Sequence, residues 1–176
     1  MIKTSMMSDT MSRQKESFDL REMLKLTAEL NLDGIDFVQL HDTPARELRK
    51  MTDDLGIPVV CHTFFASLNQ ATSAERQAAL GTVKEGVEAA VELGAPTVMI
   101  PTPHKGDTFT RDQARSNWIE RLREAKPIAD EAGVTLAVEN FPGANSPFVL
   151  ADDAVRRATD YLRRLDAEIT TSAWRK

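Results

Sequence analysis

The sequence has a single cysteine and no long apolar run, and these two absences narrow the classes of protein to which it can belong. Cys61 has no second cysteine with which to form an internal disulfide, which fits a reducing compartment. No stretch approaches the roughly 18 apolar residues of a membrane span. The opening residues, MIKTSMMSDTMSRQKE, lack the apolar core of a secretory signal peptide. We therefore expect a cytoplasmic protein with no membrane partner.

An excess of positive charge is also missing. The chain carries 22 Lys and Arg against 27 Asp and Glu, for a net charge of −5 at pH 7. Because nucleic acids attract basic proteins, we expect no nucleic-acid partner. The sequence contains no G-x-G-x-x-G, P-loop, C-x-x-C or H-E-x-x-H motif. Nucleotide cofactors and zincin chemistry therefore lack support.

What the 176 residues do contain is a regular alternation of strand-like and helix-like segments. Short apolar runs predict strands, and apolar residues at helical spacing predict a helix after each of them. Pro127 should kink the fourth helix or break it in two, because proline lacks the backbone donor and clashes with the preceding turn. The expected strands span 2–7, 34–40, 57–62, 95–103 and 134–140, and the expected helices span 18–31, 43–56, 73–94, 110–133 and 151–168.

Glycines mark the ends of these repeating units. Gly56, Gly94 and Gly133 each follow a helix and lie 38 and 39 residues apart, which indicates repeated strand–loop–helix units. Strands that are apolar along nearly their whole length are typical of a parallel sheet covered by helices. Two architectures remain at this point, an open doubly wound sheet and a (β/α) barrel.

Polar side chains gather where the predicted strands end. In both architectures the chemistry lies at the carboxyl ends of the strands, and all three histidines of the chain fall there. This asymmetry makes the strand ends the candidate functional edge. The polar residues at this edge are Gln39, His41, Asp42, His62, Thr63, His104, Lys105, Glu139 and Asn140.

Glu139 ends the most apolar strand, in the stretch GVTLAVENFPG. Thr135, Ala137 and Glu139 share one face of that strand, so in a barrel this face can point inward. A carboxylate in such a place is unfavourable unless it is paired or bound to a metal. Glu139 is therefore either a divalent-metal ligand or general base, or a residue in a salt bridge with a neighbouring Lys or Arg.

His62 ends the strand before the aromatic pair Phe64 and Phe65. Its imidazole can ligate a metal, position a substrate hydroxyl or cap a barrel through hydrogen bonds. Cys61 faces the opposite side of the strand, so the two residues should not form a nucleophile–base dyad, and Cys61 is expected in the core. The phenylalanines either line a sugar-sized pocket or belong to the core. His104 belongs either to an active-site loop or to a surface turn.

Four segments together resemble the sugar phosphate isomerase/epimerase family, the xylose isomerase-like TIM barrels. They are LNLDGIDFVQL, GIPVVCHTFF, ELGAPTVMIPTP and EAGVTLAVENFPG. The resemblance implies an α/β fold, a partial (β/α) TIM barrel of about five βα units. It also implies a sugar or sugar-phosphate isomerase or epimerase that moves a proton next to a carbonyl with the help of a divalent metal ion (Mn, Mg, Co or Zn).

The same resemblance assigns roles to individual residues. Glu139, in the motif VEN, matches the first metal ligand of the family and is expected to be catalytic. His62 matches a third-strand histidine, expected to be catalytic and to contact substrate. Substrate contacts are also expected from Phe64, His104 and Asn140. The expected partner is a small sugar or sugar phosphate.

The chain departs from the family in length. A complete barrel needs about 200–250 residues, so residues 1–160 are expected to form a partial barrel and 161–176 a tail that need not be family sequence. The ligands of strands six to eight would then be missing, which predicts weak or no activity in a truncated chain. One alternative is an apurinic endonuclease-like metal phosphodiesterase that uses His62, His104 and Glu139. Another is a non-catalytic half-barrel that pairs with a second copy or a partner through its open edges.

Overall fold

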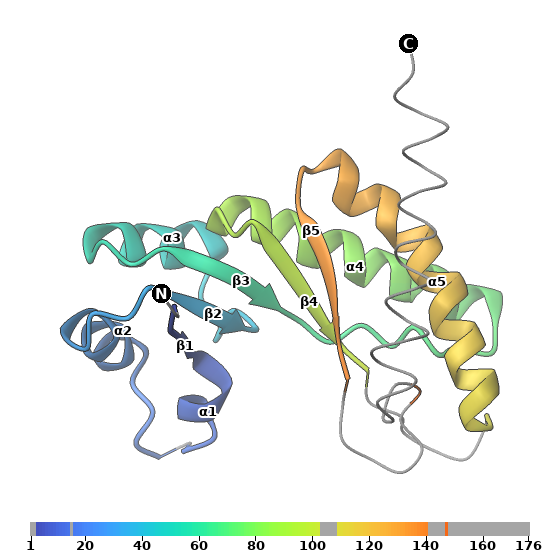
Figure 1. The fold of residues 1–176 in the computed structure, drawn as a ribbon, viewed down its shortest axis with the longest axis horizontal. Coiled ribbons are helices and arrows are strands. Elements are labelled where there is room, and N and C mark those ends of the chain that lie inside the picture. Colours follow the sequence, from blue (N-terminus) through green and yellow to red (C-terminus); the bar gives the residue numbers. More distant parts are fainter. Residues whose placement is uncertain (1–2, 15, 103–108, 141–146, 148–176) are drawn as a thin grey trace.

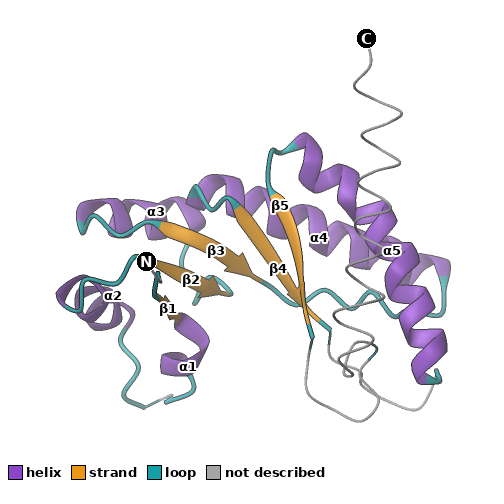
Figure 2. Cartoon of the chain, viewed as in Figure 1, coloured by secondary structure: helices purple, strands orange, loops and turns teal. Residues whose placement is uncertain are grey.

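The computed structural model describes residues 3–14, 16–102, 109–140 and 147, which form one parallel sheet with its helices (Figure 1). The strands lie in the order β1-β2-β3-β4-β5, and each neighbouring pair is parallel. Strands and helices alternate along the chain as the sequence predicts (Figure 2). The elements are β1 (Ser5–Met7), α1 (Ser8–Ser12), α2 (Leu20–Glu29), β2 (Gly34–Val38), α3 (Ala45–Asp54), β3 (Val59–Thr63), α4 (Ser73–Leu93), β4 (Thr97–Pro101), α5 (Arg111–Glu131) and β5 (Thr135–Glu139).

Several bounds differ from those expected. β1 has three residues, and the short helix α1 follows it directly, where the sequence suggested no helix. α5 is one helix that contains Pro127, so of the kink or break predicted there, the break does not occur. The helix expected over 151–168 and the tail 161–176 lie outside the described residues. Within the described part, no helix is long and apolar enough to cross a membrane.

Helix starts and ends follow local chemistry. The side chain of Asp19 caps α2, because its Oδ1 accepts hydrogen bonds from the backbone N–H groups of Arg21 (2.8 Å) and Glu22 (3.0 Å). Thr72 forms a capping box at the start of α4 with the residue three positions later. The same helix ends at Gly94, whose φ of 72° is the left-handed conformation that favours glycine.

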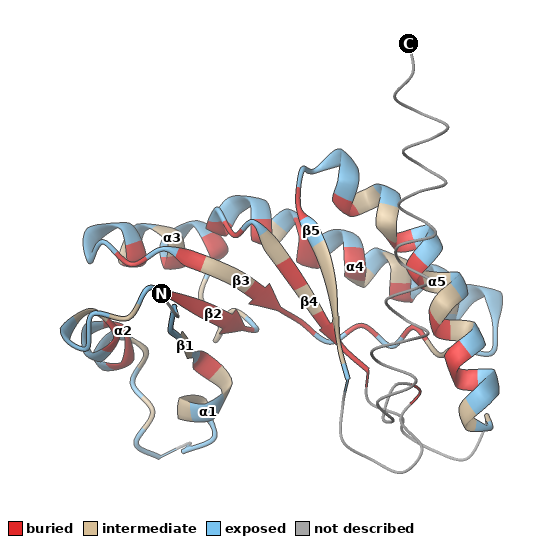
Figure 3. Cartoon of the chain, viewed as in Figure 1, coloured by how far each residue is buried: buried red, intermediate tan, exposed pale blue. Residues whose placement is uncertain are grey.

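The sheet has two different faces, which are set by the strand register. One row of paired residues packs with the helices into the core, where Phe37 and Val98 are fully buried. We call this side the helix face. Figure 3 shows buried segments along β2, β3 and β4. The opposite row lies on the side that we call the open face, where Val38 and Thr63 are buried and Met99 and Ala137 are half-buried. The helix-face row is Phe37, His62, Val98 and Leu136, and the open-face row is Val38, Thr63, Met99 and Ala137.

A β-bulge in β3 shifts this register. Ile35 pairs with Val59, whereas Asp36 pairs with Cys61, so Val60 is an extra residue with no partner in β2. A Cβ atom at Gly34 would lie 2.4 Å from Cγ1 of Val60. Glycine at position 34 therefore makes room for the bulged side chain.

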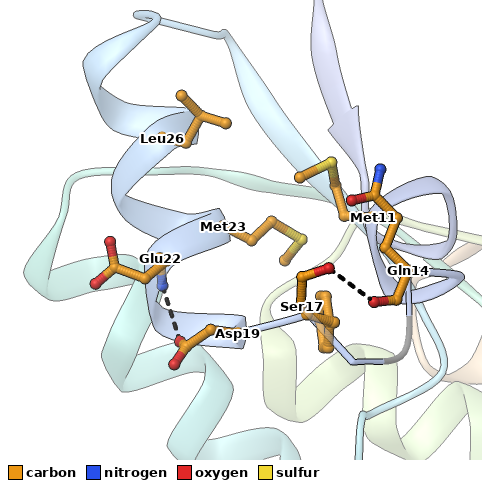
Figure 4. Close-up of a pocket in the computed structure, with 8 residues that line it drawn as sticks. Met11, Gln14, Ser17, Asp19, Glu22, Met23 and Leu26 are labelled. Atoms are coloured by element: carbon orange, nitrogen blue, oxygen red, sulfur yellow. Dashed lines mark hydrogen bonds between the residues drawn. The ribbon is translucent and has the colours of Figure 1, made fainter.

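A small surface pocket of about 110 Å³ lies between α1 and α2. Figure 4 shows Met11 and Met23 facing each other across it, with Asp19 and Glu22 at its edge. It is lined by the residues of the first two helices and their connection, not by the carboxyl ends of β3 to β5. The pocket is therefore separate from the candidate site described below.

Candidate functional site

Glu139 is the last residue of β5, half-buried on the open face. It lies on this face because Ala137, two residues earlier, belongs to the open-face row. The backbone of Glu139 is fixed to β4, since its carbonyl oxygen accepts from Oγ1 of Thr102 at 2.8 Å and from N–H of Thr102 at 3.2 Å. The predicted rim position of Glu139 at the carboxyl end of the fifth strand is therefore observed.

A second carboxylate, Asp36, lies on the open face in the middle of β2. Asp36 is 6% exposed, and Oγ1 of Thr63 lies 3.0 and 3.1 Å from its two oxygens. Burial raises the pKa of Asp36, while hydrogen bonds from Thr63 and Cys61 partly offset that effect. The sequence reasoning missed this residue, although a carboxylate inside the apolar run GIDFV was an available signal.

The surroundings of Glu139 are negative. Burial first, and then the charges of Asp36 and Asp9, raise the pKa of Glu139. Of the two alternatives for this residue, the salt bridge has no support within the described ranges, where none of the ion pairs involves Glu139. A half-buried carboxylate with anionic neighbours has the electrostatics of a cation-binding or proton-transfer group.

His62 lies on the helix face and is 2% exposed. Its Nδ1 lies 3.0 Å from the carbonyl oxygen of Phe37, which can only accept, so Nδ1 carries the proton and Nε2 holds the lone pair. Burial lowers the pKa of His62, which keeps the ring neutral near pH 7. The structure thus places His62 and Glu139 on opposite faces of the sheet, and a catalytic role for His62 stays a prediction.

The two phenylalanines after β3 differ in their surroundings. Phe64 is 7% exposed, and a Cβ at Gly86 of α4 would lie 2.3 Å from its ring, so Phe64 packs against that helix. Its ring centroid is 5.6 Å from that of His62. Phe65 is 45% exposed. A substrate contact was predicted for Phe64, but the exposed aromatic side chain at this end of β3 is that of Phe65.

Cys61 lies on the open face beside Asp36, opposite to His62, as the alternation of β3 predicts. Its Sγ is 3.8 Å from Oγ1 of Thr63. Burial and the charge of Asp36 raise the pKa of Cys61 to about 12, so the group is a thiol rather than a thiolate near neutral pH. Cys61 is half-buried rather than fully in the core.

The remaining predicted contacts are only partly described. Asn140 follows β5 directly and is exposed. His104 and Lys105 fall in 103–108, outside the described residues. At the end of β2, Gln39 and His41 both adopt positive φ values, of 63° and 49°.

The open face offers the kind of oxygen ligand that a divalent cation binds, but too few such ligands. Carboxylate oxygens such as those of Glu139 suit Mg²⁺ and Mn²⁺. Among the described residues, however, no group of three or more His, Cys, Asp and Glu side chains is placed to hold a metal ion. Since a catalytic metal site uses about three protein ligands, this part of the chain does not form a complete one.

Five parallel strands that alternate with helices, with a carboxylate at the carboxyl end of the fifth strand, define a partial (β/α) barrel. Residues 24–167 match the family of xylose isomerase-like TIM barrels. The match covers most of the chain, which therefore belongs to that family.

Solved structures share the fold at low sequence identity. The IolI protein with a bound zinc atom superposes with a TM-score of 0.76 at 15% identity, over 94% of this chain and 59% of that one. D-psicose 3-epimerase from Clostridium cellulolyticum H10, solved with D-tagatose, gives 0.73 at 15% identity, over 94% and 60%. The 3-keto-D-glucoside 4-epimerase YcjR from E. coli gives 0.65 at 16% identity, over 92% and 65%. The comparison with curated proteins gives no match.

The lengths of these chains differ from that of the present one. This chain spans 59% of the IolI protein and 60% of the D-psicose 3-epimerase. The chain therefore corresponds to a little more than half of each of those proteins.

Proposed function

We propose that this chain supplies the metal-binding and proton-transferring carboxylate of a sugar or sugar-phosphate isomerase or epimerase. The observation that carries the proposal is the position of Glu139 at the carboxyl end of β5, on the open face of a xylose isomerase-like barrel. The names of similar structures, which include epimerases of D-psicose and of a 3-keto-D-glucoside, support the substrate class. The single cysteine supports a cytoplasmic location.

The residues of this chain supply specific parts of that chemistry. Glu139, whose pKa is raised by burial and by nearby anionic groups, is suited to accept a proton from a carbon next to a carbonyl and to return it. Asp36 lies lower on the same face, buried, with Thr63 beside both of its oxygens. A divalent cation, when bound, supplies polarisation of the substrate oxygens.

The metal site in this proposal is larger than the described residues. Glu139 is the ligand that they contribute, and the further donors come from outside them. Substrate contacts by His62, Phe64, His104 and Asn140 remain part of the proposal. Phe65 joins them, because it is the exposed aromatic residue after β3.

Calorimetric titration with Mn²⁺ tests the assignment of Glu139. We expect Glu139→Gln to weaken Mn²⁺ binding by more than about tenfold, because the amide loses the charge that a ligand needs. Glu131→Gln is the matched control, since Glu131 is an exposed residue at the end of α5. Equal binding by the wild type and Glu139→Gln would overturn the assignment.

A second measurement tests the reaction itself. With Mn²⁺ present, the protein should catalyse at most slow incorporation of solvent deuterium next to the carbonyl of a ketohexose, followed by NMR, in keeping with the weak activity expected of a partial barrel. Glu139→Gln should abolish that exchange and Glu131→Gln should leave it unchanged. The protein could bind Mn²⁺ through Glu139 and yet exchange no deuterium into any of a panel of ketoses and their phosphates. That result would support Glu139 as a metal ligand and would contradict the proposed reaction.

A further inference from the structure

A serine hydroxyl joins three segments at the carboxyl ends of the first two strands. Ser8, the first residue of α1, is fully buried. Its Oγ accepts a hydrogen bond of 2.8 Å from the backbone N–H of Val38, the last residue of β2. The same oxygen lies 2.8 Å from Nε2 of His41, in the loop between β2 and α3. Ser8 therefore connects α1, β2 and this loop through one atom.

The ring of His41 is held from several sides. Its centroid lies 5.2 Å from that of Phe18, which precedes α2. Its backbone has a φ of 49°, and its carbonyl oxygen accepts from Oγ1 of Thr43 at 3.1 Å. Gln39 and Asp42 also have positive φ values, of 63° and 55°, although none of these residues is glycine. Histidine and aspartate enter this conformation more readily than most non-glycine residues, but glutamine does so rarely, so three such residues within four positions indicate a loop that is held by its contacts.

The hydrogen-bond roles at Ser8 depend on the protonation of His41. A serine hydroxyl has one proton to donate and two lone pairs. When His41 is neutral with a lone pair on Nε2, Ser8 donates to it while accepting from Val38, so the hydroxyl, Nε2 and the Val38 N–H are all satisfied. When His41 is protonated, Nε2–H and the N–H of Val38 both donate to Ser8. The hydroxyl proton then has no acceptor within the described residues, which is unfavourable for a buried group.

We propose that Ser8 and His41 form a pH-sensitive latch, which is closed while His41 is neutral. Protonation of His41 opens the latch and releases α1 and residues 39–43 from the end of β2. The inference concerns the fold itself and stands independently of the proposed enzymatic function.

The charges around His41 act in both directions. Asp42 lies in the same loop and Asp9 in α1, and both favour the protonated ring. Asp9 is itself paired with Arg13, at 2.6 Å between Nη2 and Oδ2, and Phe18 on the remaining side is uncharged. Burial outweighs these charges and lowers the pKa of His41. The latch therefore opens below the pH range in which an exposed histidine titrates.

NMR on the full chain tests the latch through two local signals. The ring resonances of His41 should titrate with a midpoint below about 6.5. Over the same pH range, and after correction for intrinsic exchange, the protection of the Val38 amide should fall by about tenfold or more. The amide of Ile100, a fully buried residue of β4, serves as the internal control and should keep its protection.

Two variants decide between the latch and other causes. His41→Gln cannot be protonated, so protection at Val38 should become independent of pH between 5 and 8. Ser8→Ala should move the titration midpoint of His41 upward, and if that variant does not fold, His41→Gln still decides. The proposal is overturned if His41 titrates without a change at Val38. It is also overturned if His41→Gln keeps the pH dependence, because the effect would then belong to another group, such as His62, the other histidine among the described residues.

Discussion

Oγ1 of Thr63 lies within 3.1 Å of both carboxylate oxygens of Asp36, across the boundary between β2 and β3. Its single hydroxyl proton is shared between them, and Asp36 is almost completely shielded from water. A buried carboxylate depends on such donors, because it has lost its hydration. This pair is therefore the most direct place to measure the energetics of the open face.

Thr63→Val removes the hydroxyl and keeps the shape of the side chain. We expect it to lower the free energy of unfolding at pH 7 by about 1.5–3 kcal/mol, the range for hydrogen bonds to charged groups. Urea denaturation measures the change. Thr97→Val is the matched control, since Thr97 lies in β4 on the same face and is only half-buried. Equal effects of the two substitutions would contradict a specific role for the hydroxyl of Thr63.

Asp36→Asn tests the ionisation of Asp36. Burial raises the pKa of Asp36 in the folded state above its pKa in the unfolded state. Its contribution to the free energy of unfolding is therefore fully present at a pH below the unfolded-state pKa. That contribution is lost as the pH rises through the folded-state pKa. Asparagine stays neutral at every pH. We therefore expect the stability of the variant relative to wild type to increase as the pH rises from about 4 to 7. A difference that is constant over this range would contradict the prediction.

Cys61 should be unreactive toward alkylation. Its pKa of about 12 leaves little thiolate at pH 8, so iodoacetamide should react much more slowly than with a free cysteine. Asp36→Asn removes the nearby negative charge and should shift the pH profile of alkylation to lower pH. Asp54→Asn, at an exposed position of α3, should leave the profile unchanged. A wild-type midpoint near about 8.5 would contradict the burial argument.

Gly86→Ala should destabilise the protein, although alanine normally favours a helix by about 1 kcal/mol. The new Cβ would lie 2.3–2.5 Å from ring atoms of Phe64, and such overpacking costs about 1–3 kcal/mol. Gly81→Ala, in the same helix with no atom within 4 Å of the new Cβ, should instead stabilise. Thermal unfolding measures both variants. A Phe64→Leu background should reduce the cost of Gly86→Ala, and a cost that stays the same would exclude the clash as its cause.

Pro127→Ala should stabilise α5. Pro127 is exposed within a continuous helix, where proline cannot donate the helical hydrogen bond and costs up to about 3 kcal/mol relative to alanine. Pro127→Gly should gain about 1 kcal/mol less, because glycine is the weaker helix former. Urea denaturation of the wild type and the two variants measures their order of stability. A loss of stability in Pro127→Ala would show that the proline has a favourable role in α5.

The fold was largely accessible from the sequence, because each βα unit has its own local signals. Apolar strands, the Asp19 cap and the glycine at the end of α4 each act over a few residues. The helix α1 was missed, since five residues with two serines give no clear helical period. Of the kink or break predicted at Pro127, the break does not occur, because a helix of 21 residues keeps its hydrogen bonds on both sides of a single proline.

The candidate site was accessible only in part. The position of Glu139 follows from the end of one strand. Whether Glu139 shares a face with His62 depends on register between strands, which local patterns do not contain. The buried carboxylate of Asp36 became visible only when β3 supplied Thr63 beside it.

Val60 gives β3 a tolerance to deletion that a regular strand does not have. Because Val59 and Cys61 pair with consecutive residues of β2, Val60 is the one residue of the bulge that the ladder does not need. Loss of its single codon would leave a regular strand, with Thr63 still beside Asp36 and His62 still on the helix face. In a strand without a bulge, the same loss would exchange the faces of every residue that follows.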